Sequence, residues 1–166
     1  MISSFLAHSR SSHLKAQGSS EGKPSSPSEG TQGTKPPSDT WNNRHAVLYF
    51  TSPDLPDFYE TVHTQRDSKT LRWIVGRHHA KIEWVAEPTY VDHVNAGAVL
   101  VDPGQEMVPV DIVAANSGHD RDMDWNCHNF VYEGLQELVR RGYQTQEWYD
   151  FVENEMMDKL LDGTVD

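Results

Sequence analysis

DMDWNCHNFVYEGLQELVRRG, residues 122–142, predicts an amphipathic helix that begins at Cys127, the only cysteine of the chain. Apolar side chains recur from there at helical spacing, at Phe130, Val131, Leu135, Leu138 and Val139. Two arginines and then Gly142 follow the last of them, an arrangement typical of a helix C-terminus. The thiol therefore lies in the first turn, on the face that packs against the rest of the fold.

The position of Cys127 has two interpretations. The first turn of a helix offers unpaired backbone N–H groups and the positive end of the helix dipole, which together lower the pKa of a thiol and make it a nucleophile. Cysteine is also often buried as a small apolar side chain. Asp124 and Asn126 are both candidates for the N-cap of this helix. Position alone leaves both interpretations open.

The remaining chain predicts an antiparallel sheet followed by helices. Strands are expected at about 44–51, 57–67, 70–76, 81–87 and 97–102, whereas the pattern of 108–118 is ambiguous and compatible with a short helix that ends near Gly118. A last helix, capped by Thr145, covers 146–162 and directs these side chains inward: Trp148, Phe151, Val152, Met156 and Leu160. The order predicts an α+β fold in which the sheet packs against C-terminal helices.

Composition divides the chain into two parts. Residues 1–40 are rich in Ser, Pro and Gly, which predicts a disordered tail, and residues 41–166 have enough apolar residues for one domain. The chain has a formal charge of −11 and the tail contributes +1, so residues 41–166 carry −12. Such an acidic domain disfavours nucleic acid and anionic membranes as partners.

The sequence favours a cytoplasmic protein. No run approaches 18 consecutive apolar residues, so no membrane span is predicted, and the N-terminus lacks the apolar core of a secretory signal. The first twenty residues contain Arg10, Lys15 and several serines but no acidic residue. This composition weakly resembles a transit peptide, so a mitochondrial location is the alternative.

Two acidic or histidine-rich stretches suggest metal sites only superficially. Asp120, Asp122 and Asp124 have the alternate spacing of a calcium loop, but Trp125 and Val131 occupy the positions of its glycine and its glutamate. A second stretch brings His78, His79 and Glu83 close in sequence, without the paired cysteines or the His-Glu-x-x-His pattern of a zinc site. We therefore predict no metal and no cofactor.

Two of the nine histidines lie where they can act together. His45 opens the first expected strand and His63 lies within the second, so antiparallel neighbours can bring their rings together. A thiol nucleophile requires a base, usually an imidazole, that a third polar group orients. His45 and His63 are the candidates for these two roles.

Three separated motifs, RHAVLYF (44–50), YETVH (59–63) and NCHNFVYEGL (126–135), resemble the circularly permuted papain-like thiol enzymes. These include the lecithin retinol acyltransferase-like group and the permuted thiol peptidases. The stretches 44–54, 61–67 and 124–143 are similar to mostly uncharacterised fungal proteins with His-Trp-Ala and Trp-Asn-Cys-Gln signatures. The resemblance covers roughly 44–160, and the chain departs from it at Ala46, His128 and Phe130.

The resemblance implies a permuted papain-like domain with Cys127 as nucleophile, His45 as base and His63 as the orienting residue. It implies a cysteine-dependent acyl-transfer enzyme, either a hydrolase of amide, isopeptide or ester bonds or an acyltransferase. Its substrate would be a protein, a peptide or an acyl compound, with the helix N-terminus at Asn126 and Cys127 stabilising the oxyanion. The alternative is a non-catalytic protein-binding domain that retains the fold. Neither the substrate nor the oligomeric state follows from the sequence.

Overall fold

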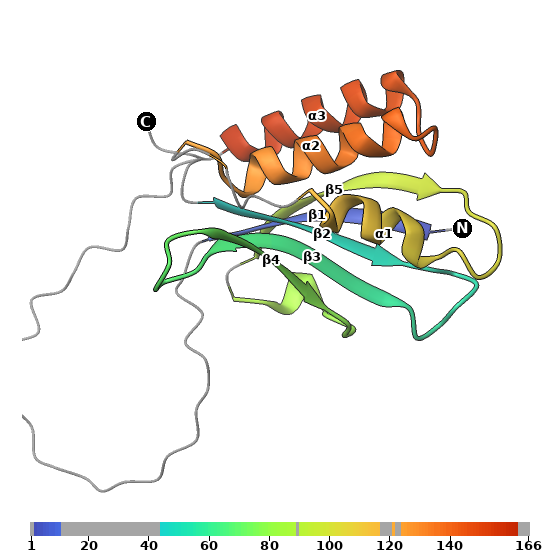
Figure 1. Cartoon of the computed structure of the whole chain (residues 1–166), viewed down its shortest axis with the longest axis horizontal. Helices are drawn as coiled ribbons and strands as arrows, with labels where there is room; N and C mark the ends of the chain where they lie inside the picture. Colours follow the sequence, from blue (N-terminus) through green and yellow to red (C-terminus); the bar gives the residue numbers. More distant parts are fainter. Residues whose placement is uncertain (1, 11–43, 89, 117–120, 122–123, 163–166) are drawn as a thin grey trace, which may run out of the picture.

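The computed structural model describes residues 2–10 (as backbone), 44–88, 90–116, 121 and 124–162. The fold is α+β, with a five-stranded antiparallel sheet in the order β4-β3-β2-β1-β5 (Figure 1). The strands are β1 (Ile2–Arg10), β2 (Arg44–Thr51), β3 (Tyr59–Arg66), β4 (Trp73–His78) and β5 (Tyr90–Val99). The helices are the 3-10 helix η2 (Trp84–Ala86), α1 (Met107–Ala114), α2 (Cys127–Arg140) and α3 (Gln146–Leu161).

The first strand corrects the prediction of a disordered tail over residues 1–40. Ile2–Arg10 forms β1, which lies inside the sheet and pairs with β2 on one side and β5 on the other. Both sets of its backbone hydrogen-bonding groups therefore face a neighbouring strand, which stabilises a segment that composition alone marks as unstructured. The rest of the expected tail, residues 11–40, lies outside the described residues.

Two of the expected strands differ from the structure. The segment 81–87 is not a strand. It contains the 3-10 helix η2 and pairs with none of the five strands of the sheet. β5 begins at Tyr90 and ends at Val99, so it starts earlier than the strand predicted at 97–102. The strands predicted around β2, β3 and β4 are confirmed.

The helices follow the sequence pattern closely. α2 begins at Cys127, and Gly142 follows it with a φ of 78°, a left-handed conformation that favours glycine at a helix end. The Thr145 side chain caps α3 by accepting a hydrogen bond from Trp148 N. The prediction of the inward face of α3 was wrong at one position: Phe151 is 57% exposed, and Tyr149 is buried in its place. None of the described helices is long and apolar enough to cross a membrane.

The sheet has a helix face and an opposite face. α2 and α3 lie over one side of the sheet and η2 lies on the other (Figure 1). Side chains alternate along β2, so Ala46, Leu48 and Phe50 join the main core with residues of the helices. Val47 and Tyr49 are also buried but point to the opposite face, where the ring of Tyr49 contacts that of Trp84 in η2. We call these two sides the helix face and the η2 face.

Candidate functional site

The N-terminus of α2 is fixed by a reciprocal capping box. The Asn126 side chain accepts hydrogen bonds from His128 N at 2.9 Å and Asn129 N at 3.2 Å. The Asn129 side chain in turn accepts from Asn126 N at 3.1 Å. Of the two candidates for the N-cap, the structure therefore selects Asn126 and not Asp124. This arrangement holds Cys127 at the first position of the helix.

The thiol of Cys127 contacts the backbone of β2 on both sides of His45. Its Sγ accepts a hydrogen bond from Ala46 N at 3.4 Å and directs its own proton to Arg44 O at 3.9 Å. The pairing of β2 with β3 ends at Val47 and His63, just before this point. The sulfur therefore lies beside the first residues of β2, where the ladder between these two strands has ended.

The environment of the thiol corrects the expectation of a low pKa. Cys127 is 9% exposed, and burial raises the pKa of its thiol because the charged form loses its hydration. Backbone N–H groups of Ala46, Cys127 and His128 lower that pKa, but by less than burial raises it. The helix N-terminus is present as predicted, and its effect is outweighed.

Three histidines form a row across β2, β3 and β4. His45 Nε2 lies 3.2 Å from His63 Nδ1, and His63 Nε2 lies 3.2 Å from His78 Nε2. In both pairs the ring centroids are 5.3 Å apart. The prediction that neighbouring strands bring His45 and His63 together is confirmed. We call His45, His63 and His78 the histidine row.

Sequence reasoning missed the position of His78 beside His63, because it considered His78 only as a zinc ligand. The register supplies the signal: β3 and β4 pair Thr61 with His78 and His63 with Gly76, so His63 and His78 share the η2 face. Gly76 leaves room for the neighbouring ring, because a Cβ at this position would lie 2.4 Å from His63 Nε2. A side chain here would displace the central ring of the row.

Two rings of the row are uncharged at neutral pH. Burial lowers the pKa of His45 to about 4, helped by the nearby His63 and His128. Burial also lowers the pKa of His63 to about 4, helped by His78. Each buried ring therefore has one nitrogen that carries a proton and one that accepts a hydrogen bond.

The structure does not join the two halves of the predicted site by a hydrogen bond. Among the described residues, the hydrogen bonds of Sγ go to the backbone of Ala46, and weakly to that of Arg44, and not to the ring of His45. Alternation directs the Cβ of His45 to the η2 face, whereas Cys127 reaches β2 from the helix face. Cys127 and His45 are nevertheless close in space, because the sulfur contacts the backbone of the residues on either side of His45.

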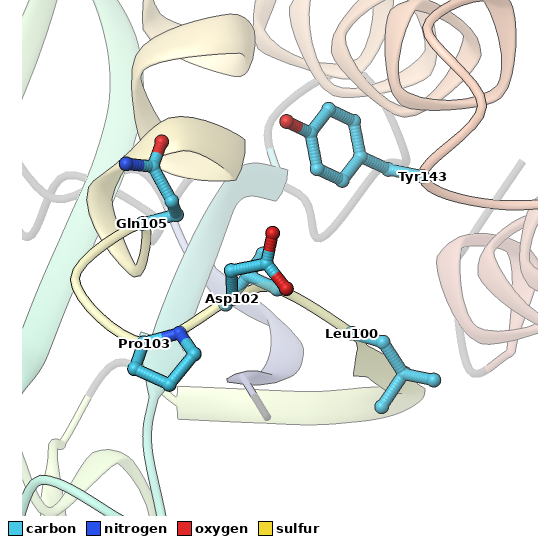
Figure 2. Close-up of a pocket in the computed structure, with 6 residues that line it drawn as sticks. Leu100, Asp102, Pro103, Gln105 and Tyr143 are labelled. Atoms are coloured by element: carbon cyan, nitrogen blue, oxygen red, sulfur yellow. The ribbon is translucent and has the colours of Figure 1, made fainter.

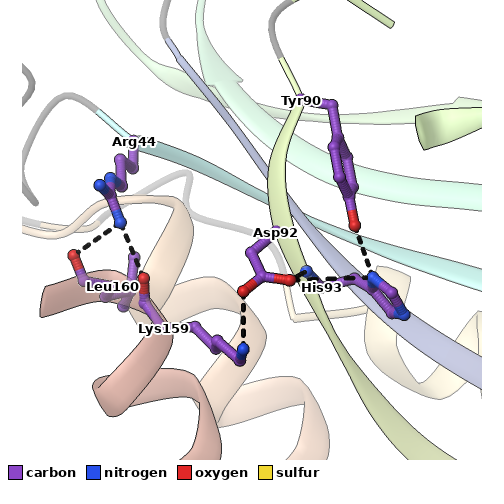
Figure 3. A network of polar contacts seen from close by, with 6 residues as sticks. All are labelled: Arg44, Tyr90, Asp92, His93, Lys159 and Leu160. Atoms are coloured by element: carbon purple, nitrogen blue, oxygen red, sulfur yellow. Dashed lines mark hydrogen bonds and ion pairs between the residues drawn. The ribbon is translucent and has the colours of Figure 1, made fainter. Parts of the chain in front are cut away.

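Arg44 anchors the start of β2 and with it the position of the thiol. Its buried guanidinium donates hydrogen bonds to Lys159 O at 2.7 Å and Leu160 O at 3.2 Å, at the C-terminal end of α3 (Figure 3). Lys159 Nζ forms an ion pair with Asp92 of β5 at 2.7 Å. A cation at this end of a helix is favourable because of the helix dipole. The backbone that meets Sγ is thus tied to both α3 and β5.

A shallow pocket of about 480 Å³ lies elsewhere, where β5 leads towards α1 (Figure 2). Its lining residues are Leu100, Val101, Asp102, Pro103, Gln105 and Tyr143. Neither Cys127 nor any member of the histidine row lines it. This pocket is therefore separate from the candidate site.

The described residues contain no group of three or more His, Cys, Asp or Glu side chains that could hold a metal ion. Comparisons with protein-family models, curated proteins and solved structures find no match to the chain. The interpretation of the site therefore rests on the chain's own residues and geometry.

Proposed function

We propose that the chain is a cysteine-dependent acyl-transfer enzyme with a permuted papain-like arrangement. Cys127 is the nucleophile, His45 the base and His63 the residue that orients the base. The proposal rests mainly on the 3.2 Å contact between His45 Nε2 and His63 Nδ1, beside a thiol that contacts the backbone on both sides of His45. This contact uses Nε2 of His45 and leaves Nδ1 to accept the proton of the thiol.

The reaction would start from a neutral thiol and a neutral imidazole. In the proposed reaction His45 Nδ1 takes the thiol proton while Sγ attacks the acyl carbon. This step requires the His45 ring to turn towards the sulfur, because its Cβ points to the η2 face. The bond from sulfur to carbon forms, the bond from carbon to the leaving group breaks, and the leaving group receives the proton from Nδ1. Water or another acceptor then releases the acyl group from sulfur in the same way, with His45 again as the base.

Backbone N–H groups beside the sulfur can stabilise the oxyanion that forms during attack. Ala46 N already donates to Sγ at 3.4 Å, and Cys127 N lies in the first turn of α2. Both donors are fixed by secondary structure, so they need little rearrangement when negative charge develops on the substrate oxygen. Asn126 contributes indirectly, because its capping box holds this turn in place.

The test is acylation of Cys127 by an activated ester such as p-nitrophenyl acetate. The release of nitrophenolate measures the rate, and mass spectrometry of the peptide that contains Cys127 detects the acetyl group. The folded wild type should acquire an acetyl group on Cys127. His45→Ala should lower the acylation rate about 100-fold to 10,000-fold, because it removes the general base. His93→Ala, an exposed histidine outside the row, serves as the matched control.

Equal acylation rates in folded wild type and His45→Ala would contradict the proposal. Circular dichroism of each variant separates loss of the base from loss of the fold. Hydrolysis and transfer are then distinguished by whether added amines or alcohols appear in the released acyl product.

The environment of the thiol favours the alternative, a non-catalytic protein-binding domain. Cys127 is only 9% exposed, burial raises the pKa of its thiol, and the sulfur has no hydrogen bond to His45. In this case no acylation occurs while the protein is folded, and the formal charge of −12 on residues 41–166 selects a basic protein as the partner.

A further inference from the structure

We propose that His78 is a positioning residue that sets the tautomers of the histidine row, and so decides whether His45 Nδ1 can accept a proton. The catalytic meaning of this inference rests on the proposed function, whereas the tautomers themselves can be measured without it. The observation behind it is the continuous chain of nitrogen contacts from His45 through His63 to the exposed His78.

The geometry of the row makes each contact a directed hydrogen bond. The rings of His45 and His63 meet at 88°, and those of His63 and His78 at 20°, yet both contacts have the same 3.2 Å separation between nitrogens. Each contact needs one nitrogen with a proton and one without. The middle ring uses both of its nitrogens, so the state of one contact dictates the state of the other.

When His78 Nε2 accepts, the row has one arrangement. His63 Nε2 then donates to His78, which leaves His63 Nδ1 as an acceptor. His45 Nε2 donates to that acceptor, so the proton of the neutral His45 ring is on Nε2. His45 Nδ1 is consequently bare and able to take the proton of the thiol.

When His78 is protonated, the row must reverse. Both nitrogens of His78 then carry protons, so His78 Nε2 donates to His63 Nε2. The single proton of His63 moves to Nδ1 and donates to His45 Nε2, which places the proton of His45 on Nδ1. The base is lost although neither His45 nor His63 has become charged.

Burial keeps the rings of His45 and His63 uncharged. Both rings are desolvated, with pKa values of about 4, whereas His78 is exposed. The ionisable group outside the row that acts on it is His128 of α2, which helps to lower the pKa of His45. Beside His78, Arg77 pairs with Asp111 of α1 at 2.8 Å and with Glu60 of β3 at 3.9 Å, and His79 pairs with Glu60 at 2.7 Å.

Gly76 is a second and independent sign that the row is built into the sheet. It lies opposite His63 in the register of β3 and β4, and a Cβ there would lie 2.4 Å from the nitrogen that contacts His78. A glycine at this cross-strand position allows the His63 ring to extend over β4 towards His78. Any larger residue would break the contact that transmits the state of His78.

The experiment is long-range proton–nitrogen NMR on the full, ¹⁵N-labelled chain, which distinguishes bare from protonated imidazole nitrogens. As the pH falls from about 8 to about 5, the proton of His45 should move from Nε2 to Nδ1 while the ring stays neutral. His78→Gln should abolish this movement, because an amide takes up no proton in this range. His78→Lys, a permanent donor, should hold the proton on Nδ1 of His45 throughout.

His79→Gln is the matched control, since it changes the neighbouring exposed histidine and should leave the movement intact. A His45 tautomer that stays constant with pH in the wild type, or that still changes in His78→Gln, would overturn the inference. If the wild type acylates, its acylation rate should fall over the same pH range as the tautomer changes, and His78→Gln should retain activity at lower pH. If no variant is acylated, the proposed function fails, and the NMR result still decides the inference.

Discussion

The half-buried His45 and the buried His63 should make folding stability depend on pH in a direction that can be worked out from their pKa values. His45 and His63 have pKa values of about 4 in the folded protein, below their ordinary value of 6.5. As the pH falls below 6.5, His45 and His63 bind protons in the unfolded chain, whereas in the folded protein they bind them only near pH 4. Stability is therefore fully present above the unfolded pKa and is lost as the pH falls towards the folded pKa.

The magnitude follows from the size of the shift. Each shift of about 2.5 units corresponds to about 3 kcal/mol when the loss is complete, at about 1.4 kcal/mol per unit. From about pH 7 to about pH 5, where the unfolded histidine is almost fully protonated, the expected loss is about 2 kcal/mol per histidine. His63→Gln removes the contribution of His63 to this pH dependence. Between about pH 7 and about pH 5, the free energy of unfolding of the variant should therefore fall by about 2 kcal/mol less than that of the wild type.

Urea unfolding, followed by tryptophan fluorescence at both pH values, measures this difference. Carboxylates titrate alike in both proteins, so their contribution cancels in the comparison. His45 keeps the main cause of its lowered pKa in His63→Gln, because burial contributes more to it than His63 does. His93→Gln, at an exposed position, should behave as the wild type does. The same loss of stability in wild type and His63→Gln would refute the idea that burial keeps this ring neutral.

Three further changes test the packing around the site. Gly76→Ala should destabilise the protein by about 1–3 kcal/mol in urea unfolding, because its Cβ would overlap the ring of His63. Asn126→Ala should cost about 1 kcal/mol in the same assay through loss of the helix cap. Phe130→Ala should cost about 3–5 kcal/mol, because the Phe130 side chain is fully buried in the core. Alkylation of Cys127 by iodoacetamide should be slow near neutral pH and should accelerate on unfolding, since burial raises the pKa of the thiol.

Local signals explain why the helices were predictable. The apolar stripe from Cys127, the glycine at 142 and the cap at Thr145 are all contained within a few residues of the helices that they define. The hairpin of β2 and β3 was predictable for a similar reason, because the two strands are neighbours in sequence. This adjacency was enough to predict from the sequence that His45 and His63 lie close together.

Elements that depend on distant partners were not predictable. β1 is stabilised by pairing with β2 and β5, which lie far along the chain, and its sequence is followed by a long Ser-rich stretch that dominates the composition. The segment 81–87 has the alternation of a strand, but it pairs with none of the five strands and forms η2. The position of His78 beside His63 could not be predicted, because it depends on the register of β4 against β3, which residue patterns do not specify.

The pKa of Cys127 shows two opposing effects whose balance only the structure supplies. A helix N-terminus stabilises a negative charge by about 0.3–1 kcal/mol at an exposed position, whereas full burial shifts a pKa by up to about 3–5 units. The first effect can be read from the sequence, but the second depends on how closely β2 covers the sulfur. Here burial is the larger effect, and the pKa of the thiol is raised.

This balance determines which kind of thiol chemistry the site can perform. A preformed pair of thiolate and imidazolium would need a charged His45, but burial and the nearby His63 and His128 lower the pKa of His45 to about 4. Proton transfer must then accompany attack on the substrate, as in an enzyme with a hydroxyl nucleophile. Slow alkylation of Cys127 by iodoacetamide would therefore be compatible with catalysis, because that reagent measures the thiolate already present at rest. During acylation by an ester, His45 would take the proton of the thiol as the sulfur attacks. The dependence of the acylation rate on His45 is therefore the decisive measurement.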